Sequence, residues 1–530
     1  MRVKYSWVLA LLLTGCQLTQ PPESSHTVDE SDTSQAIKDA TTSPNLDEDT
    51  HIASTEVTPD SDPVPEITPQ TQQDVWQRIG MQLHMDIPEN KTVDYYRTWY
   101  LKHPSHLRTV SKRAEPFLYL IVEEIERREL PLELALLPIV ESSFDAFAYS
   151  HGSAAGLWQF VPATGEYYGL EQNFWYDGRR DVVAATDAAL TYLARLNARF
   201  DGDWNNAIAA YNSGGGRVNS AIRKNRNLGK PTDFFSLDLP KETSGYVPKL
   251  LALADIIANQ EAYGIEIPPI ANKPVIELVD PKEQLDLAIA ADYANISVKE
   301  LQSLNPAYNQ WATAPDKHQT MLLPIDSVDA FNKKVEENRG KGMRLVRYQV
   351  QSGDSLSVLA QKYNTTTRVI QTANNLSSHS IRVGQHLMIP TSTQDEKAYA
   401  LSSANRLAQT QSRARGQYQL THTVQSGDSL WTIARANKVS HQSLAKWNGM
   451  GPRDTLRIGQ KLVIWKNSSD GAIIRTVFYK VRSGDTISGI ASKFKVKSND
   501  IVKWNELHKN KYLQPGQKLK LYVDVTKVSV

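Results

Sequence analysis

The C-terminal third of the sequence contains one short unit written three times, and this repeat restricts the fold more than any other feature. The copies begin VQSGDSL, VQSGDSL and VRSGDTI, at Val350, Val424 and Val481. In every copy an Asn lies 22 residues after the Ser of SGD, at Asn374, Asn448 and Asn505. Each copy then closes on GQxL. This agreement indicates three small domains of one fold, and small tandem domains usually bind a partner.

The secondary structure predicted for each repeat is β-α-α-β. A short β-type run opens the copies, at 347–350, 421–424 and 478–481. Two helical segments follow, such as LWTIARANKV and HQSLAKWN, and a second apolar run such as KLVIW closes the unit. The predicted domains are 345–391, 419–466 and 477–523, with polar linkers at 391–418 and 466–476. The hydroxyl of SGDS is expected to cap the first helix, since it can accept from free backbone N–H groups.

The combined SGD, Asn and GQ landmarks resemble LysM domains, which bind glycans containing N-acetylglucosamine, mainly peptidoglycan and chitin. The resemblance implies a groove between the loop after the first strand and the loop after the second helix. It places nine residues near that groove: Gly353, Asp354, Ser355, Gly427, Asp428, Ser429, Gly484, Asp485 and Thr486. The alternative is that SGD caps a helix whether or not sugar binds, and for individual residues capping is the favoured interpretation.

The N-terminus, MRVKYSWVLALLLTGC over residues 1–16, has the features of a signal peptide. Arg2 and Lys4 precede an apolar run that is shorter than the ~20 residues of a membrane span. The ending LTGC resembles the lipobox of bacterial lipoproteins, which implies acyl chains on Cys16. Gln17 after it implies transfer to the outer membrane, on the periplasmic side. The alternative is a stray thiol in an ordinary signal peptide, although Cys16 is the only cysteine and has no disulfide partner in the chain.

Residues 17–74 are predicted to be a disordered tether. They are rich in Pro, Ser, Thr, Asp and Glu and have few large apolar groups, so they cannot bury enough surface to offset the entropy of ordering. The net charge of the whole chain is +1 and basic residues form no cluster, so nucleic acid is not an expected partner. We expect a monomer.

Residues 75–268 are predicted to form an all-α domain. Leucines at three- and four-residue steps mark a helix over 181–200, and Asp203 is the expected N-cap of the next helix, which the glycines at 214–216 should end. Another apolar helix is predicted over 246–258. Residues 269–340 echo the helical middle and closing strand of the repeats but lack SGD and GQ. They are either a degenerate fourth repeat or an unrelated region.

Several chemistries are excluded by missing motifs. The sequence has no Cys pair, no HExxH and no His cluster at ligand spacing, so we expect no metal and no cofactor. It also lacks GxxxxGK[ST], GxGxxG and GxSxG. With its only cysteine in the lipobox, the chain has no candidate thiol nucleophile.

One carboxylate remains as a candidate catalyst. Glu141 follows a predicted buried helix that contains LELALLPIV. Burial disfavours the charged form, raises the pKa of a carboxyl group and keeps it protonated near neutrality, as a general acid requires. The alternative is an ordinary exposed Glu at a helix end, which the local pattern alone favours.

Two further segments change that balance. Glu141-Ser142 is followed by GLWQ at 156–159 and AYN at 210–212, and this ordered triple resembles the family 1 lytic transglycosylases. Those enzymes have a goose-type-lysozyme-like α fold, and the resemblance covers roughly residues 110–262. The common family motif is GLMQ, so Trp158 departs from it. Glu242 and Tyr246, in ETSGYV, match a fourth family element near the catalytic Glu.

The resemblance assigns roles residue by residue. It makes Glu141 the catalytic acid and then base, and gives Tyr246 a supporting role beside it. It places the remaining candidates on the substrate: Ser142, Ser143, Trp158, Gln159, Tyr211 and Asn212. Core packing is the alternative for the aromatic residues Trp158 and Tyr211.

The implied activity is cleavage of the bond between N-acetylmuramic acid and N-acetylglucosamine in peptidoglycan, with 1,6-anhydromuramoyl ends formed. A glycosidase usually carries two carboxylates, and only one convincing candidate is present. Two alternatives stay open. The first is a hydrolytic muramidase of the same fold, and the second is a non-catalytic lipoprotein that binds the wall.

Overall fold

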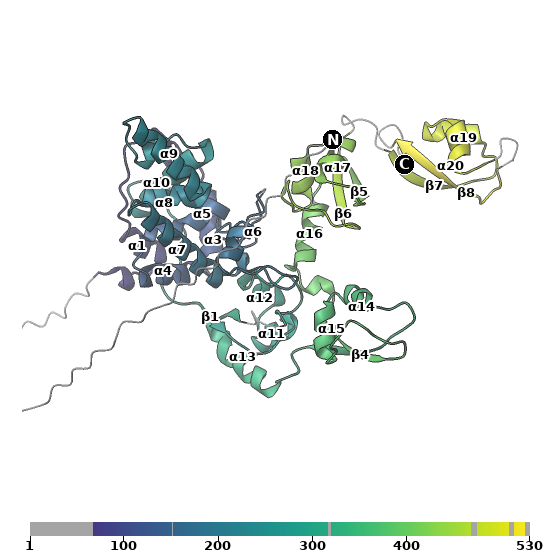
Figure 1. Cartoon of the computed structure of the whole chain (residues 1–530), viewed down its shortest axis with the longest axis horizontal. Coiled ribbons are helices and arrows are strands. Elements are labelled where there is room, and N and C mark those ends of the chain that lie inside the picture. The colour runs from purple at the N-terminus through teal and green to yellow at the C-terminus, as the bar shows by residue number, and fades with distance from the viewer. Residues whose placement is uncertain (1–66, 151, 316–319, 468–473, 508–512, 525–530) are drawn as a thin grey trace, which may run out of the picture. The chain divides into compact units, whose positions relative to one another are not determined.

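The computed structural model describes residues 67–150, 152–315, 320–467, 474–507 and 513–524 (Figure 1). The predicted signal peptide, Cys16 and most of the predicted tether lie outside these residues. In the described part of the chain, no helix combines the length and apolar character needed to cross a bilayer.

The N-terminal region is helical, as predicted. Its α-helices are α1 (Val75–Gly80), α2 (Lys91–Lys102), α3 (Pro104–Ala114), α4 (Leu118–Arg127), α5 (Leu137–Ser142), α6 (Pro162–Tyr167), α7 (Val182–Arg199), α8 (Trp204–Ser213), α9 (Gly215–Asn227) and α10 (Lys241–Ala258). The 3₁₀ turns are η1 (Pro69–Thr71), η2 (Leu132–Leu136), η3 (Gly178–Arg180) and η4 (Phe234–Ser236). Helix α10 packs against α1, α2, α5 and α8. It is apolar around most of its circumference, which is why it forms the centre of this core.

The predicted cap at Asp203 is confirmed, and Asp181 is a further cap that was not predicted. The side chains of Asp181 and Asp203 accept backbone N–H groups at the starts of α7 and α8. Gly214 ends α8 with φ 88°, a left-handed conformation that glycine adopts without penalty. The other two glycines of this run were expected to end α8, but they begin α9 instead.

The predicted tether reaches too far along the chain. Residues 67–74 belong to the folded region, because η1 and the residue after it are held by Asn272. The Asn272 amide donates to the carbonyl oxygens of Pro69, Gln70 and Gln72 at 2.9–3.4 Å. The Asp74 carboxylate also accepts from the Ile270 N–H at 2.9 Å, so polar contacts hold a segment that buries little apolar surface.

Each repeat folds as β-α-α-β around its own core. The elements are β3 (Arg344–Gln349), α14 (Leu356–Lys362), α15 (Thr367–Ala373) and β4 (His386–Thr391); β5 (Tyr418–Thr423), α17 (Leu430–Ala436), α18 (His441–Trp447) and β6 (Lys461–Lys466); and β7 (Ile474–Lys480), α19 (Ile487–Phe494), α20 (Ser498–Trp504) and β8 (Lys518–Asp524). The two strands of each repeat pair antiparallel. The linker predicted at 391–418 is partly helical, since it contains η5 (Glu396–Ala398) and α16 (Ser403–Ser412).

The repeated Asn has a structural function. In the second repeat Asn448 donates to the carbonyl oxygens of Leu444 and Val463 at 2.8 Å, and accepts from the Val463 N–H at 2.7 Å. Asn374 and Asn505 make the same three bonds in their repeats. The side chain thus joins the end of the second helix to the closing strand, which explains why its spacing is constant.

Residues 276–337 repeat this order with β1 (Ile276–Val279), α11 (Leu287–Tyr293), α12 (Val298–Leu304) and β2 (Met321–Pro324), followed by α13 (Ile325–Glu337). Asn305 makes the same bridge, to Leu301 and Leu322. Its distance from the N-cap Asp286 equals that from Ser429 to Asn448. The core here also includes Trp175 and Tyr176 from the N-terminal helical region.

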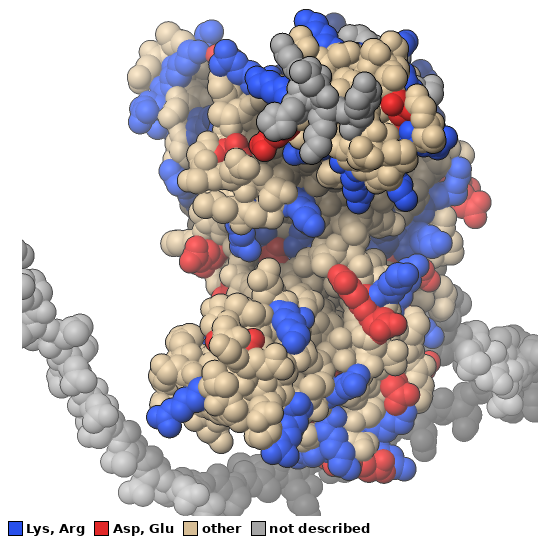
Figure 2. Space-filling view, turned by 90° about the vertical axis from the view of Figure 1, so that its right-hand side faces the viewer, with Lys and Arg blue, Asp and Glu red and all other residues tan. Residues whose placement is uncertain are grey.

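On the face drawn in Figure 2, Lys and Arg side chains are scattered among uncharged and acidic residues rather than gathered in one stripe.

Candidate active site

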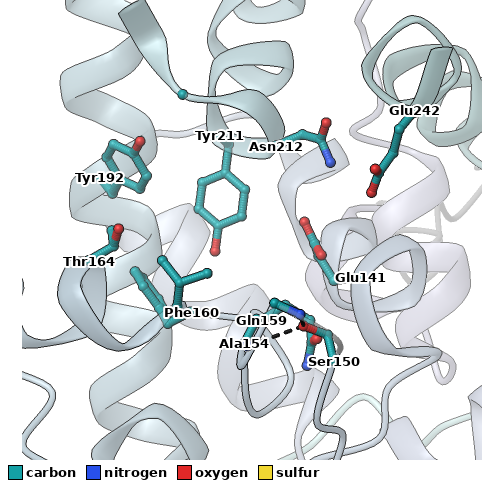
Figure 3. Close-up of a pocket in the computed structure, with 13 residues that line it drawn as sticks. Glu141, Ser150, Ala154, Gln159, Phe160, Thr164, Tyr192, Tyr211, Asn212 and Glu242 are labelled. Atoms are coloured by element: carbon teal, nitrogen blue, oxygen red, sulfur yellow. Dashed lines mark hydrogen bonds between the residues drawn. The ribbon is translucent and has the colours of Figure 1, made fainter. Parts of the chain in front are cut away.

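A cleft of about 690 Å³ opens in the helical region, and Glu141 lies in its wall (Figure 3). Residues from α5, α6, α7, α8 and α10, together with the loop before α6, form the lining. They are Glu141, Ser150, Gly152, Ala154, Gln159, Phe160, Val161, Thr164, Tyr192, Tyr211, Asn212, Gly214 and Glu242. The sequence segments ES, GLWQ and AYN are therefore brought to one place.

The fold holds Glu141 in the last turn of α5, a short helix whose first three residues are buried. The helix ends because Ser143 and Phe144 both take left-handed backbone conformations, with φ 53° and 57°. The chain turns away there and leaves the carboxyl group at the cleft wall. Burial raises the pKa of Glu141 to about 7, against an ordinary value of 4.5, so a substantial fraction of the group keeps its proton at neutral pH.

Helix α10 supplies the groups that control this carboxyl group. The Tyr246 hydroxyl donates to Glu141 Oε1 at 2.5 Å and lowers the pKa of Glu141. The nearby charge of Lys249 also lowers that pKa, whereas the like charge of Glu242 raises it. Burial dominates all three, so the pKa stays high. Figure 3 shows Glu242 and Glu141 pointing toward the same space.

Tyr211 and Asn212 reach the cleft from the end of α8. The Tyr211 hydroxyl donates to the Trp158 carbonyl at 2.8 Å, and Asn212 Oδ1 accepts from the Thr243 hydroxyl at 2.9 Å. Gln159 lines the opposite side, with φ 49° and its amide donating to the Gly156 carbonyl at 2.8 Å. These side chains are fixed by the protein before any sugar binds.

The structure places three predicted substrate-binding residues away from the cleft lining. Trp158 is fully buried and its indole N–H donates to Thr186 at 3.0 Å, so the expectation that this side chain lines the cleft is wrong. The Ser142 hydroxyl lies 2.9 Å from the Pro138 carbonyl oxygen and 3.0 Å from the Leu157 carbonyl oxygen, and both oxygens can accept its hydrogen bond. Ser143 is the left-handed C-cap of α5.

A buried ion cluster holds the loop that carries Gln159. Arg179 pairs with Asp177 at 2.8 Å and donates to the carbonyl oxygens of Ser153 and Phe160. Gly156 lies so close that a Cβ built on it would be 2.0 Å from the Arg179 oxygen. Asp177 is thus a structural carboxylate.

The residues predicted for glycan binding in the repeats have local structural partners. Asp354, Asp428 and Asp485 each accept a backbone N–H three residues earlier, at 2.7–2.8 Å. Ser355, Ser429 and Thr486 cap the first helix of their repeats. Gly353, Gly427 and Gly484 have φ of 86–89°. The capping interpretation therefore describes the contacts inside the protein, and glycan contact by these residues stays a prediction.

Several cleft residues were not predicted from the sequence. They are Phe160, Thr164 and Tyr192. Glu242, which the resemblance had placed near Glu141 without a role, lines the cleft as a second carboxylate. Phe160 follows GLWQ directly, so its position next to that motif could have indicated it. Tyr192 lies on a helix whose leucines gave the stronger signal, and its partner Tyr211 is distant in sequence.

The family model "Transglycosylase SLT domain" matches residues 119–234, and "LysM domain" matches 348–390, 422–465 and 479–521. "Lytic transglycosylase MltD, LysM-like domain" matches 275–339. A solved structure of an inactive mutant of lytic transglycosylase Slt from Pseudomonas aeruginosa is 26% identical, with a TM-score of 0.22, over 28% of this chain and 24% of that one. The family models define the class, an SLT-type transglycosylase with LysM domains.

Two curated relatives refine this class. A putative tributyltin chloride resistance protein from an Alteromonas species is 43% identical, over 34% of this chain and 84% of its own length. Membrane-bound lytic murein transglycosylase D of Escherichia coli (strain K12) is 37% identical over 486 residues, which is 89% of this chain and 99% of that protein. The chain belongs to the family of membrane-bound lytic murein transglycosylase D.

Proposed function

We propose that this protein cleaves the glycosidic bond between N-acetylmuramic acid and N-acetylglucosamine in peptidoglycan without consuming water. The observation that carries the proposal is Glu141, a carboxyl group of raised pKa in a cleft with Gln159, Tyr211 and Asn212. The name of the Escherichia coli relative states lytic transglycosylase activity on murein, and the family membership supports the transfer of that activity to this chain.

In the first step the Glu141 carboxyl group donates its proton to the glycosidic oxygen, and the bond from that oxygen to C1 of the muramoyl residue breaks. Tyr246 holds Oε1, which leaves Oε2 to carry the proton. Positive charge develops at C1, and the resulting carboxylate stabilises it. In the second step the carboxylate takes the proton of the muramoyl 6-hydroxyl, whose oxygen bonds to C1. The 1,6-anhydro ring closes and Glu141 is protonated again.

The repeats are proposed to hold the enzyme on its polymer. Tandem sites of modest affinity raise the local concentration of the catalytic domain without changing its chemistry. Residues 275–339 are proposed as a fourth LysM-like unit, because they share the β-α-α-β order and the Asn bridge. An acylated Cys16 would anchor the chain to the outer membrane on the periplasmic side.

A hydrolytic muramidase is the second candidate, and Glu242 is the observation that favours it. It provides the second carboxylate that hydrolysis by general base catalysis needs. Mass spectrometry of muropeptides released from purified sacculi separates the two reactions, since anhydro ends support the transglycosylase and reducing ends the hydrolase. No release by the wild-type protein would leave only a wall-binding role.

A further inference from the structure

Lys249 lies three residues beyond Tyr246 on α10, so both side chains project from one face of the helix toward α5. The Lys249 ammonium group donates to the Val140 carbonyl at 3.3 Å, and Val140 immediately precedes Glu141. A cation is therefore fixed on the backbone that presents the reacting carboxyl group, on the side held by α10.

The ionisable groups that act on Glu141 come from two helices. Tyr246, Lys249 and Glu242 face it from α10, and Tyr211 faces it from α8. Among these described groups Lys249 carries the only positive charge. Lys249 is itself partly buried, so solvent screens its charge poorly. His106 of α3 lies near enough to feel this charge, which lowers the pKa of His106.

We propose that Lys249 is a positioning residue that supplies the counter-charge to Glu141, holding the backbone before it and stabilising the carboxylate formed when its proton leaves. This inference rests on the proposed function of Glu141 as acid and base. Because the group must be ionised between the two steps, a fixed cation beside it favours proton donation. Without that cation, the Tyr246 hydrogen bond alone would favour ionisation of Glu141 against burial and the charge of Glu242.

The test separates the charge of Lys249 from its hydrogen bond. Lys249→Arg keeps the charge, and Lys249→Gln keeps a donor for the Val140 carbonyl without a charge. Lys249→Met keeps neither. Lys224→Met is the matched control, because Lys224 is an exposed residue of α9 that forms an ion pair with Asp238. The initial rate of muropeptide release and kcat/KM are measured against pH, and thermal melting is recorded for every variant.

Both neutral variants are expected to shift the basic limb of the pH profile upward by about one pH unit, and to lower the plateau rate about tenfold. Lys249→Arg and Lys224→Met should follow the wild type. If Lys249→Gln kept the wild-type limb and rate, the counter-charge would be refuted, and a lower melting temperature alone would give Lys249 only a structural role.

A second measurement does not depend on activity. The titration of Glu141 can be followed by NMR in protein labelled with ¹³C at the Glu carboxyl carbons, with Glu141→Gln used for assignment. A higher pKa in Lys249→Gln supports the inference even if the products prove to be hydrolytic. An unchanged pKa overturns it, even if the products carry anhydro ends.

Discussion

Replacing Glu141 by Gln should stabilise this protein at alkaline pH and sharply reduce its turnover. Gln is neutral, is nearly the same size, and can still accept from the Tyr246 hydroxyl. In the wild type, burial raises the pKa of Glu141 from 4.5 to about 7. At 1.36 kcal/mol for each pKa unit, this shift corresponds to about 3 kcal/mol between the two protonation states.

The sign of the effect follows from which state binds the proton more tightly. The folded protein has the higher pKa, so protonated Glu141 favours folding fully below pH 4.5, and this contribution is lost as pH rises through 7. Glu141→Gln has no such loss. Relative to the wild type, its free energy of unfolding should therefore gain about 3 kcal/mol on going from pH 4 to pH 8.5.

Calorimetry of the full chain can follow the melting transition of the catalytic region. For a domain of this size 1 kcal/mol changes Tm by about 2–4 °C, so the difference between the two proteins should widen by about 6–12 °C at the higher pH. Glu166→Gln, at an exposed position of the same region, is the matched control. An equal Tm difference at both pH values would show that Glu141 does not titrate as a buried acid. Turnover by Glu141→Gln should fall by about 10²–10⁴-fold.

Three further substitutions test other parts of the structure. Tyr246→Phe removes a bond that lowers the pKa of Glu141, so the basic limb of the kcat/KM profile should move to higher pH and the rate should fall about tenfold. Asn448→Ala leaves buried backbone groups without their partner, and should lower the free energy of unfolding of the second repeat by about 2–3 kcal/mol in urea titrations, with catalysis on a short soluble glycan unchanged. Gly156→Ala forces a Cβ against the Arg179 carbonyl at φ +81°, and should cost about 3 kcal/mol in the thermal stability of the catalytic region. A wild-type melting curve for Gly156→Ala would contradict the close packing of that loop.

Much of the fold could be predicted because its signals are local. Helix α7 begins one residue after the Asp that caps it, and each strand of the repeats lies within a few residues of its predicted place. Short-range hydrogen bonds and apolar periodicity determine these features. Glu141 was found from an apolar run and an ordered triple of motifs, and both lie in the primary sequence.

The remaining features depend on contacts between distant residues. Trp158 stands in a motif that lines the cleft, but its own side chain turns into the core toward Thr186 on α7, which no local pattern shows. Lys249 looks like an ordinary surface lysine in the sequence, and only the packing of α10 on α5 gives it a role. The fourth unit lacks SGD and GQ, yet its Asn305 could have been found from the cap-to-Asn spacing had an Asp been accepted in place of the Ser.

The two kinds of small unit differ in how they can be inherited. The second and third repeats close their cores from their own residues, so evolution can duplicate, delete or exchange either of them and leave the rest of the gene product intact, whereas Val369 of the first repeat also packs into the core of the unit at 276–337. The unit at 276–337 instead borrows Trp175 and Tyr176, and Asp177 donates its backbone N–H to Ala307 at 2.9 Å. Asp177 in turn holds Arg179 and the loop of Gln159. A protein that lacked this unit would expose the rings of Trp175 and Tyr176 and lose a support of the loop that forms one wall of the cleft. Substitutions in this unit are therefore constrained by the catalytic domain.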